Sequence, residues 1–319
     1  MYKRQEQAGF GLLVLIFQDG RLEGLLAYES QGALELVGAA AAGPAARPPR
    51  AARGAHLTLA ADTRLERVGE DRWRGEVSER WWIQRGPFGG YVSTFLVRAL
   101  MAAVDDPARP PRSLTVHFVD APQAGPVDVV VATERVGRSS SSLSLRLEQE
   151  GRPMALALAS CAVWREGEPE WADARAPAAP SPEDCPPVER VDGAPGFHDR
   201  FEIRWVEGGA PGRPAGEARN LAWLRLQEGG ALDHLAVTAL SDGWMPAAFS
   251  KLGRFLIVPT FDLTIHFRSP LPAAGDWLLG DYRSRFSAGG AWEEDGELWA
   301  ADGTLVAQSR QLAMMREPR

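Results

Sequence analysis

Leu114-Thr115-Val116-His117-Phe118 and Leu263-Thr264-Ile265-His266-Phe267 carry the same pattern, 149 positions apart (263 − 114). Each stretch alternates apolar side chains with polar or small ones, as a β-strand with one buried face does. Because so short a match can arise by chance, the flanking sequences decide whether it marks a repeat.

The flanks of the two stretches correspond as well. Downstream, a turn and strand at 151–157 answer those at 302–307, with Met154 opposite Leu305 at an offset of 151 (305 − 154). Upstream, apolar helical stretches occupy 90–104 and 232–252. The order helix, strands, turn and final strand occurs twice, which indicates a duplication.

Each copy is expected to place one largely buried helix against an antiparallel sheet. The first copy should begin with strands at 56–60 and 73–82. A long helix wrapped by a curved antiparallel sheet is the hotdog arrangement. The sequence therefore predicts an α+β fold, a tandem double hotdog in which two long central helices are wrapped by one continuous curved antiparallel β-sheet. Since one sheet cannot cover either helix completely, the two halves should pair edge to edge across a pseudo-dyad.

Composition divides the chain into four segments. Residues 38–53 are almost only Ala, Gly, Pro and Arg, and we interpret 1–53 as an N-terminal extension or a misassigned start. A signal peptide is the weaker alternative, because no small-residue cleavage site follows the short apolar stretch. We expect hotdog units at 54–166 and 197–319, joined by a Pro-rich linker at 167–196.

Charge and composition exclude several classes of protein. The net charge is −7 and there is no sustained basic run outside 47–53, so no nucleic-acid partner is expected. No apolar run approaches the roughly 20 residues that span a bilayer, so no membrane segment is expected either. Two cysteines, Cys161 and Cys185, imply no disulfide framework and suit a reducing cytoplasm. Five His and two Cys show no metal-ligand spacing, and no Gly-x-Ser-x-Gly elbow occurs, so we expect neither metal nor cofactor.

Short motifs recur in order over about residues 56–319. In the first copy they are Pro87-Phe88-Gly89-Gly90, His117-Phe118, Gly137-Arg138-Ser139-Ser140 and Glu150-Gly151-Arg152-Pro153. In the second they are Ser241-Asp242, Thr260-Phe261-Asp262, Ser287-Ala288-Gly289-Gly290 and Gln311-Leu312-Ala313-Met314-Met315-Arg316. In this order and spacing the chain resembles acyl-CoA thioesterases of the thioesterase II (TesB-like) type, which are double hotdogs.

The resemblance implies an acyl-CoA substrate and a catalytic water held by three side chains. Matched to the family's motif, these are Asp242 on the second helix, Thr260 before the following strand, and Gln311 on the last strand. The family's usual Gln-Glu-Gly run reads Gln-Leu-Ala here, and Leu263 replaces a frequent His. Double hotdogs often associate further, so a homo-oligomer is one option and the sequence leaves the oligomeric state open.

Thioester hydrolysis needs a nucleophile and a site for the developing oxyanion. A desolvated carboxylate can act as general base toward water, and a hydroxyl and an amide can orient that water. The oxyanion is best met by backbone N–H groups at a helix N-terminus, each contributing about 3 kcal/mol. Gly89-Gly90 opens the first helix, and we assign the oxyanion role to the Gly90 and Tyr91 amides.

Several of these residues could instead have a purely structural role. Asp242 could be a helix cap, and Gly89-Gly90 a tight turn. His117 and His266 occupy equivalent positions, which favours a structural role. By the offsets above, Gln311 corresponds to Ser160 and Thr260 to Pro111, and no acid occurs in 87–104, so one active site per chain is expected.

Two rival functions are also compatible with the sequence. A hotdog dehydratase would need a catalytic His with an acidic partner, for which only His234 beside Asp233 qualifies. A non-catalytic protein that binds acyl-CoA or an acyl chain is the alternative from another class.

Overall fold

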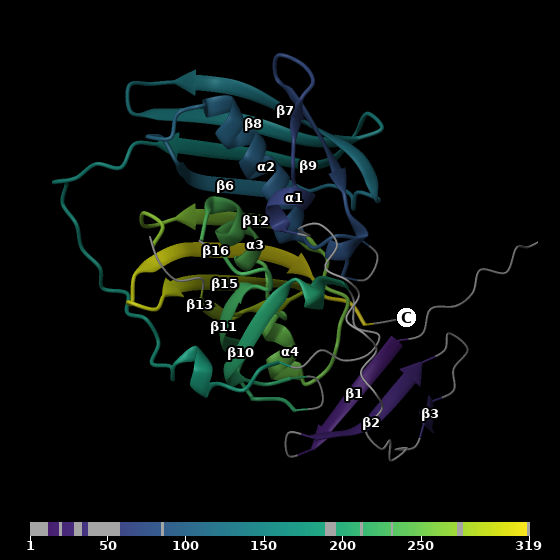
Figure 1. Ribbon diagram of the computed structural model, residues 1–319. Coiled ribbons are helices and arrows are strands. Elements are labelled where there is room, and N and C mark those ends of the chain that lie inside the picture. Colours follow the sequence, from purple (N-terminus) through teal and green to yellow (C-terminus); the bar gives the residue numbers. More distant parts are fainter. Residues whose placement is uncertain are drawn as a thin grey trace, which may run out of the picture.

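A computed structural model describes residues 58–83, 86–188, 196–210, 213–230, 232–272 and 277–317, and the backbone of three strands nearer the N-terminus. Those strands, β1 (Leu12–Gln18), β2 (Arg21–Tyr28) and β3 (Leu34–Val37), form an antiparallel sheet of their own (Figure 1). The rest of the predicted extension 1–53 lies outside the described residues.

The other strands form one 13-stranded sheet in the order β10-β11-β13-β15-β16-β12-β6-β9-β8-β7-β5-β4, with β14 paired to β15. In the first half the bounds are β4 (Glu66–Arg67), β5 (Arg72–Val77), β6 (Pro111–Phe118), β7 (Gly125–Val136), β8 (Ser140–Gln149) and β9 (Arg152–Ala162). In the second they are β10 (Phe201–Gly208), β11 (Arg219–Leu226), β12 (Thr260–Phe267), β13 (Leu278–Arg283), β14 (Ser287–Ala288), β15 (Ala291–Ala300) and β16 (Leu305–Met314).

The two repeated strands pair with each other at the centre of this sheet. β6 and β12 run antiparallel with Val116 opposite Leu263 and Thr115 opposite Thr264, and the Oγ1 atoms of the two threonines lie 3.0 Å apart. On either side the order is the same, β6-β9-β8-β7 in one half and β12-β16-β15-β13 in the other. The predicted tandem double hotdog with a continuous antiparallel sheet is confirmed, and its pseudo-dyad passes between the two threonines.

Two helices pack against each other and against the sheet (Figure 1). α2 (Gly89–Val104) matches the expected first helix, and its apolar side chains are buried almost continuously from Tyr91 to Leu100. The expectation of one long second helix over 232–252 is wrong. α3 (His234–Leu240) ends early and α4 (Ala247–Leu252) begins after Pro246, because a proline lacks the N–H that a continuing helix requires.

The start of the first unit also differs from the expectation of strands at 56–60 and 73–82. Thr58 caps a short helix, α1 (Leu59–Asp62), by accepting from the Ala61 amide; His56 and Leu57 lie outside the described residues. The strand at 73–82 ends with β5, and a turn of 3-10 helix, η1 (Glu79–Trp81), follows it. Ser78 caps that turn, so a local side-chain bond replaces the sheet ladder.

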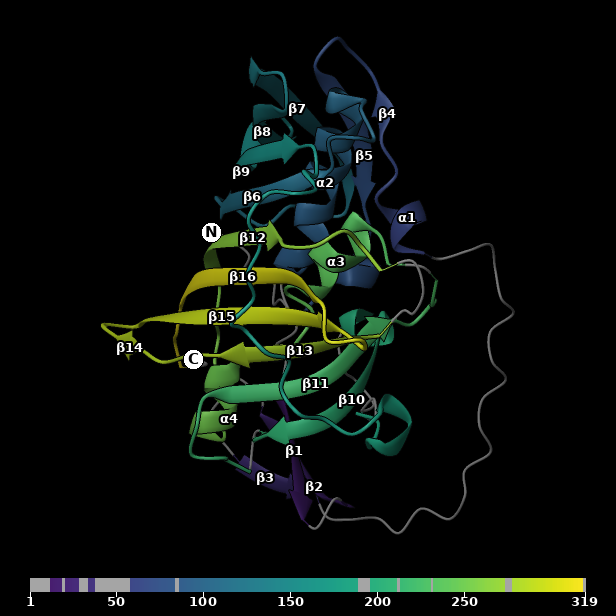
Figure 2. The ribbon, with the colours of Figure 1, turned by 90° about the vertical axis from the view of Figure 1, so that its left-hand side faces the viewer.

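The Pro-rich segment after β9 crosses the outer face of the second unit's sheet (Figure 2). The carbonyl of Pro180 accepts a hydrogen bond of 2.9 Å from the Trp223 indole N–H. Cys185 packs there with Leu221, Trp223, Leu279 and Trp299. Both cysteines are buried and free. Among the described helices, none is both long and apolar enough to cross a membrane.

Candidate active site

Asp242 stands directly after the end of α3, where the helix breaks, and its carboxylate faces the start of α2. Its Oδ2 accepts a hydrogen bond of 2.8 Å from the Gly90 amide. Phe88, the residue that precedes α2, offers no side-chain cap. An aspartate is favourable at this position because the first amides of a helix lack acceptors and carry partial positive charge. The second unit therefore supplies the acidic cap of the first unit's helix.

Two glycines allow this close approach. A Cβ at position 89 would lie 2.9 Å from Asp242 Oδ2, and one at position 90 would lie 2.5 Å from a ring carbon of Phe88 and 2.8 Å from the Ala239 carbonyl oxygen. Real Cβ atoms do not tolerate such contacts. The glycine pair is therefore required by the packing of α2 on α3, in addition to opening the helix.

Burial raises the pKa of Asp242 to about 6, while hydrogen bonds from the Gly90 amide, the Gln311 side chain and the Gly89 amide act in the opposite direction. Protein atoms enclose the carboxyl group, although the residue as a whole keeps partial solvent exposure. A carboxyl group of this kind can change protonation state near neutral pH, which general-base chemistry requires.

Thr260 and Gln311 meet across two neighbouring strands. Thr260 begins β12, and its hydroxyl donates to Gln311 Oε1 at 2.9 Å. Gln311 lies on β16 and is 9 % exposed. The Gln311 side chain also lies close enough to Asp242 to lower the pKa of its carboxyl group, so the structure brings all three predicted catalytic residues into one polar group.

A fourth polar residue, Glu294, belongs to this group and was not predicted. Asp242, Thr260, Gln311 and Glu294 are called the Asp242 group below. It lies on β15 opposite Gln311 and is 4 % exposed. Its Oε1 accepts from Gln311 Nε2 at 3.0 Å. In the sequence Glu294 is the middle member of a charged run, Glu293-Glu294-Asp295, which is typical of a solvated face. Strand alternation was the available signal, since it turns Glu294 to the opposite face from its two neighbours.

The side chain of Tyr91, the second predicted oxyanion residue, is engaged outside the Asp242 group. Its phenol is fully buried, donates to the Asp62 carbonyl at 3.0 Å and accepts from the Ser78 amide at 3.1 Å. Its ring stacks on Trp81 at 5.1 Å. The Tyr91 amide follows that of Gly90 in the first turn of α2, where amides have no intrahelical acceptor. The Gly90 amide, in contrast, already donates to Asp242.

The strand register corrects one correspondence between the two copies. Thr260 does correspond to Pro111. Thr260 is opposite Ala313 and Pro111 is opposite Cys161, and each is followed by a β-bulge in its own strand. Gln311, however, is opposite Leu263, and Ala159 is opposite Leu114, so Gln311 corresponds to Ala159 and not to Ser160. The offset in this strand is 152 (311 − 159). One extra residue in the turn before β16 causes the shift, and the turn glycines Gly151 and Gly303 already differ by 152 (303 − 151).

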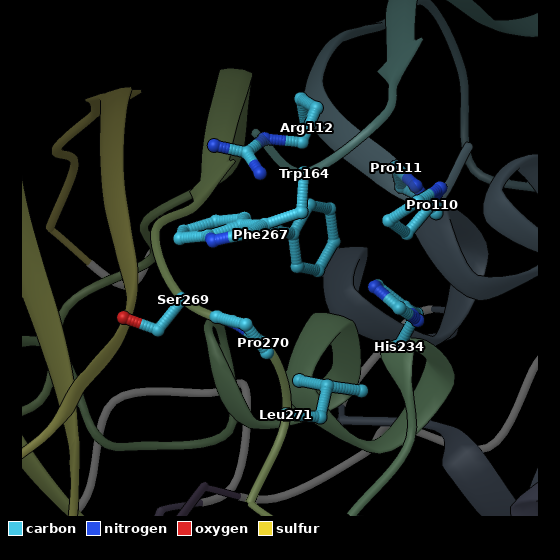
Figure 3. Close-up of a pocket in the computed structure, with 9 residues that line it drawn as sticks. All are labelled: Pro110, Pro111, Arg112, Trp164, His234, Phe267, Ser269, Pro270 and Leu271. Atoms are coloured by element: carbon cyan, nitrogen blue, oxygen red, sulfur yellow. The ribbon is translucent and has the colours of Figure 1, made fainter. Parts of the chain in front are cut away.

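An apolar pocket marks the place in the first unit that corresponds to the Asp242 group. It has a volume of about 210 Å³ and lies between the start of β6, the start of α3 and the end of β12 (Figure 3). In this pocket Pro111 occupies the position that corresponds to Thr260 in the Asp242 group. Phe267 likewise occupies the position that corresponds to Phe118. Its nine lining residues include no acid: Pro110, Pro111, Arg112, Trp164, His234, Phe267, Ser269, Pro270 and Leu271. The polar group is thus confined to one of the two related positions.

Comparisons with known proteins show the family to which the chain belongs. A family model described as the acyl-CoA thioesterase N-terminal domain matches residues 77–162, and one described as the C-terminal domain matches residues 182–315. Together they cover more than half of the chain. This protein belongs to the acyl-CoA thioesterase family. The TesB-like resemblance seen in the sequence is thereby confirmed. A search of curated proteins gave no match.

Solved structures share the fold over most of the chain. A hot dog fold protein of unknown function from Alicyclobacillus acidocaldarius has a TM-score of 0.76 at 26% identity, and covers 82% of this chain and 98% of its own. A candidate thioesterase II from Thermobifida fusca YX has a TM-score of 0.71 at 29% identity, with 81% and 97% covered. An acyl-CoA thioesterase II TesB2 from Mycobacterium marinum, at 24% identity and a TM-score of 0.66, covers 82% and 99% and shows the fold alone.

Proposed function

We propose that this protein hydrolyses acyl-CoA thioesters to the free acid and coenzyme A, using a water activated by Asp242. The observation that carries the proposal is the polar group itself. A desolvated carboxylate with a pKa of about 6 lies at a helix N-terminus, beside the hydrogen-bonded Thr260–Gln311 pair. The family supports the substrate class, and the geometry supports the mechanism.

In this mechanism ionised Asp242 accepts a proton from the water as the water oxygen attacks the thioester carbonyl carbon. Thr260 and Gln311 hold the water in line, which lowers the entropy cost of reaching the transition state. When the C–S bond breaks, the sulfur leaves with the bonding electron pair and takes up the proton that Asp242 carried. A thiolate is a good leaving group, so the reaction needs no stronger acid.

The start of α2 supplies the oxyanion site in this proposal. The Tyr91 amide is the better placed of the two predicted donors, because the Gly90 amide donates to Asp242 in the resting enzyme. Gly90 would then hold Asp242 in place through its amide, and its lack of a side chain would let the thioester approach closely. One donor of this kind contributes about 3 kcal/mol to transition-state stabilisation.

The two halves divide the work. The unit proposed at 54–166 gives the start of α2 and walls of the substrate site. The unit proposed at 197–319 gives Asp242, Thr260 and Gln311. The apolar pocket of Figure 3 has no acid, so we propose one active site per chain.

The geometry does not favour dehydratase chemistry at His234. Its ring packs on Phe267 at 5.2 Å, and burial lowers its pKa. Asp233, its sequence neighbour, caps α3 by accepting from the Ala236 amide at 2.7 Å. Neither side chain belongs to the Asp242 group.

The test is thiol release from a series of acyl-CoA chain lengths by the purified protein and by Asp242→Asn. We expect the variant to keep acyl-CoA binding and to lose turnover by about 10²–10⁴-fold, the range of general-base catalysis. Unchanged hydrolysis in the variant would overturn the water-activation scheme. Binding of acyl-CoA by the wild type without cleavage of any chain length would favour the binding-protein alternative.

A further inference from the structure

Glu294 is an acid buried in the sheet beside the proposed active site, and both of its oxygens are engaged. Oε1 accepts from Gln311 Nε2 at 3.0 Å, and Oε2 accepts from the Ala247 amide at 2.6 Å. Burying a carboxyl group is unfavourable unless its bonds are satisfied, so its placement at 4 % exposure calls for a reason.

The contacts of Gln311 supply that reason. Its amide is held at both ends, since Oε1 accepts from the Thr260 hydroxyl at 2.9 Å and Nε2 donates to Glu294. If the Gln311 amide were flipped, with its oxygen and nitrogen exchanged, its oxygen would lie against the Glu294 carboxylate. The carboxylate therefore selects one of the two possible amide orientations.

We propose that Glu294 is a positioning residue for thioester hydrolysis: it fixes the orientation of Gln311, so that the amide N–H groups face Glu294 and Asp242 and the amide oxygen faces Thr260. The proposal rests on the function proposed above. It assigns Glu294 no contact with substrate, and its effect on the catalytic water passes through Gln311.

The duplicated half shows that the fold itself does not need an acid here. In the first unit Leu143 stands opposite Ala159 on the neighbouring strand, as Glu294 stands opposite Gln311. Leu143 is 2 % exposed, so an apolar side chain fills the corresponding place without loss of the sheet. Acid and amide occur together in one unit and are absent together in the other.

The surroundings of Glu294 give its action a pH dependence. Burial, with smaller contributions from the charges of Asp242 and Glu293, raises its pKa to about 8. Tyr282 on β13 also faces it, but the Tyr282 hydroxyl donates to the Leu240 carbonyl at 2.6 Å. The ionised form accepts both hydrogen bonds, whereas the protonated form gives up one acceptor position. The hold on Gln311 therefore strengthens as pH rises through about 8.

Glu294 also caps α4 through Ala247, so the experiment must separate positioning from a merely structural role. The variants are Glu294→Gln, Gln311→Ala, their double mutant, and Glu297→Gln as the matched control. Glu297 lies on the same strand but accepts from Gln308 at 3.1 Å on the opposite face. For each, kcat and KM for an acyl-CoA would be measured across roughly pH 5 to 10, with the folded fraction followed by thermal unfolding.

Above about pH 8, where wild-type Glu294 is ionised, we expect Glu294→Gln to lower kcat by about 10–100-fold with KM changed less than about threefold. The reason is that the NH2 group of the new amide must then face one of the two N–H donors that the carboxylate accepts from. The rise of kcat near pH 8 should disappear while the limb near pH 6 remains. In the double mutant, Glu294→Gln should add little to the loss caused by Gln311→Ala, since both act through one amide. Glu297→Gln should behave as the wild type.

Additive losses in the double mutant, or an unchanged pH profile in Glu294→Gln, would overturn the positioning role. So would a loss of kcat that only follows the folded fraction. Failure of the wild type to cleave any acyl-CoA would instead overturn the proposed function, which keeps the two failures apart.

Discussion

At the scale of single residues, the protonation state of Asp242 should control the rate. With its pKa raised to about 6, the carboxyl group is protonated in acid and cannot accept the proton of water. We expect kcat/KM to fall about tenfold per pH unit below pH 6 and to change little between pH 6 and about 7, below the rise that Glu294 is expected to cause near pH 8. A pH–rate profile on a medium-chain acyl-CoA measures this, and a limb near pH 4 would show that burial does not tune the carboxyl group.

The same burial predicts a conflict between stability and activity at Asp242. Because its pKa in the folded chain lies above the ordinary value of 3.8, the stability linked to this group is fully present below that value and is lost as pH rises through about 6. Asp242→Asn should therefore raise the free energy of unfolding by up to about 3 kcal/mol at pH 8 and have little effect near pH 4. Urea unfolding at both pH values tests this, and a variant less stable than the wild type at pH 8 would contradict it.

The Thr260 hydroxyl offers a more conservative test of the polar group. Thr260→Val keeps the shape of the side chain but leaves Gln311 Oε1 without its donor, while Thr260→Ser restores the hydroxyl. We expect the valine variant to lose kcat by about 10-fold or more, with the serine variant close to wild type, since an unsatisfied buried acceptor corresponds to about 1–3 kcal/mol. Equal losses in both variants would point to packing of the methyl group instead.

Sequence reasoning reached three members of this group and missed the fourth for a definable reason. The types and order of Asp242, Thr260 and Gln311 match a family motif, so they can be recognised without coordinates. Glu294 is one of three consecutive acidic residues, so the sequence does not single it out. Only the register of β15 on β16 shows that it is opposite Gln311.

At the scale of elements, the contact between the start of α2 and the end of α3 should tolerate no added atom. Gly90→Ala would press a methyl group against Phe88, the Ala239 carbonyl and Asp242. We expect a loss of about 1–3 kcal/mol in stability from overpacking, together with a lower kcat because Asp242 is displaced. Gly69→Ala is the control, since its nearest atom would be Arg72 Cβ at 3.5 Å. Wild-type activity in Gly90→Ala would show that α2 can shift without moving the base.

The second helix shows where periodicity stops being informative. Residues 232–252 are apolar enough for one helix, yet the chain breaks between Leu240 and Ala247. Gly243 and Pro246 were visible in the sequence, but what the break achieves was not. It releases Asp242 from helical geometry, so that its side chain can reach an amide of the other unit. The strands, in contrast, were largely predictable, because alternation over half-buried segments is a strong signal.

At the scale of the whole molecule, neither half should be active alone. Asp242 belongs to one unit and the amide that anchors it to the other, and the two units share a single core and the β6–β12 pairing. Expressed separately, residues 58–166 and 167–319 would each expose a central strand edge and one apolar helix face, which favours aggregation over folding. We expect no thiol release from either fragment and recovery of activity when both are co-expressed, because the pairing across the pseudo-dyad needs no covalent link. Activity in the second fragment alone would show that the start of α2 is dispensable, and would remove the first unit from the proposed mechanism.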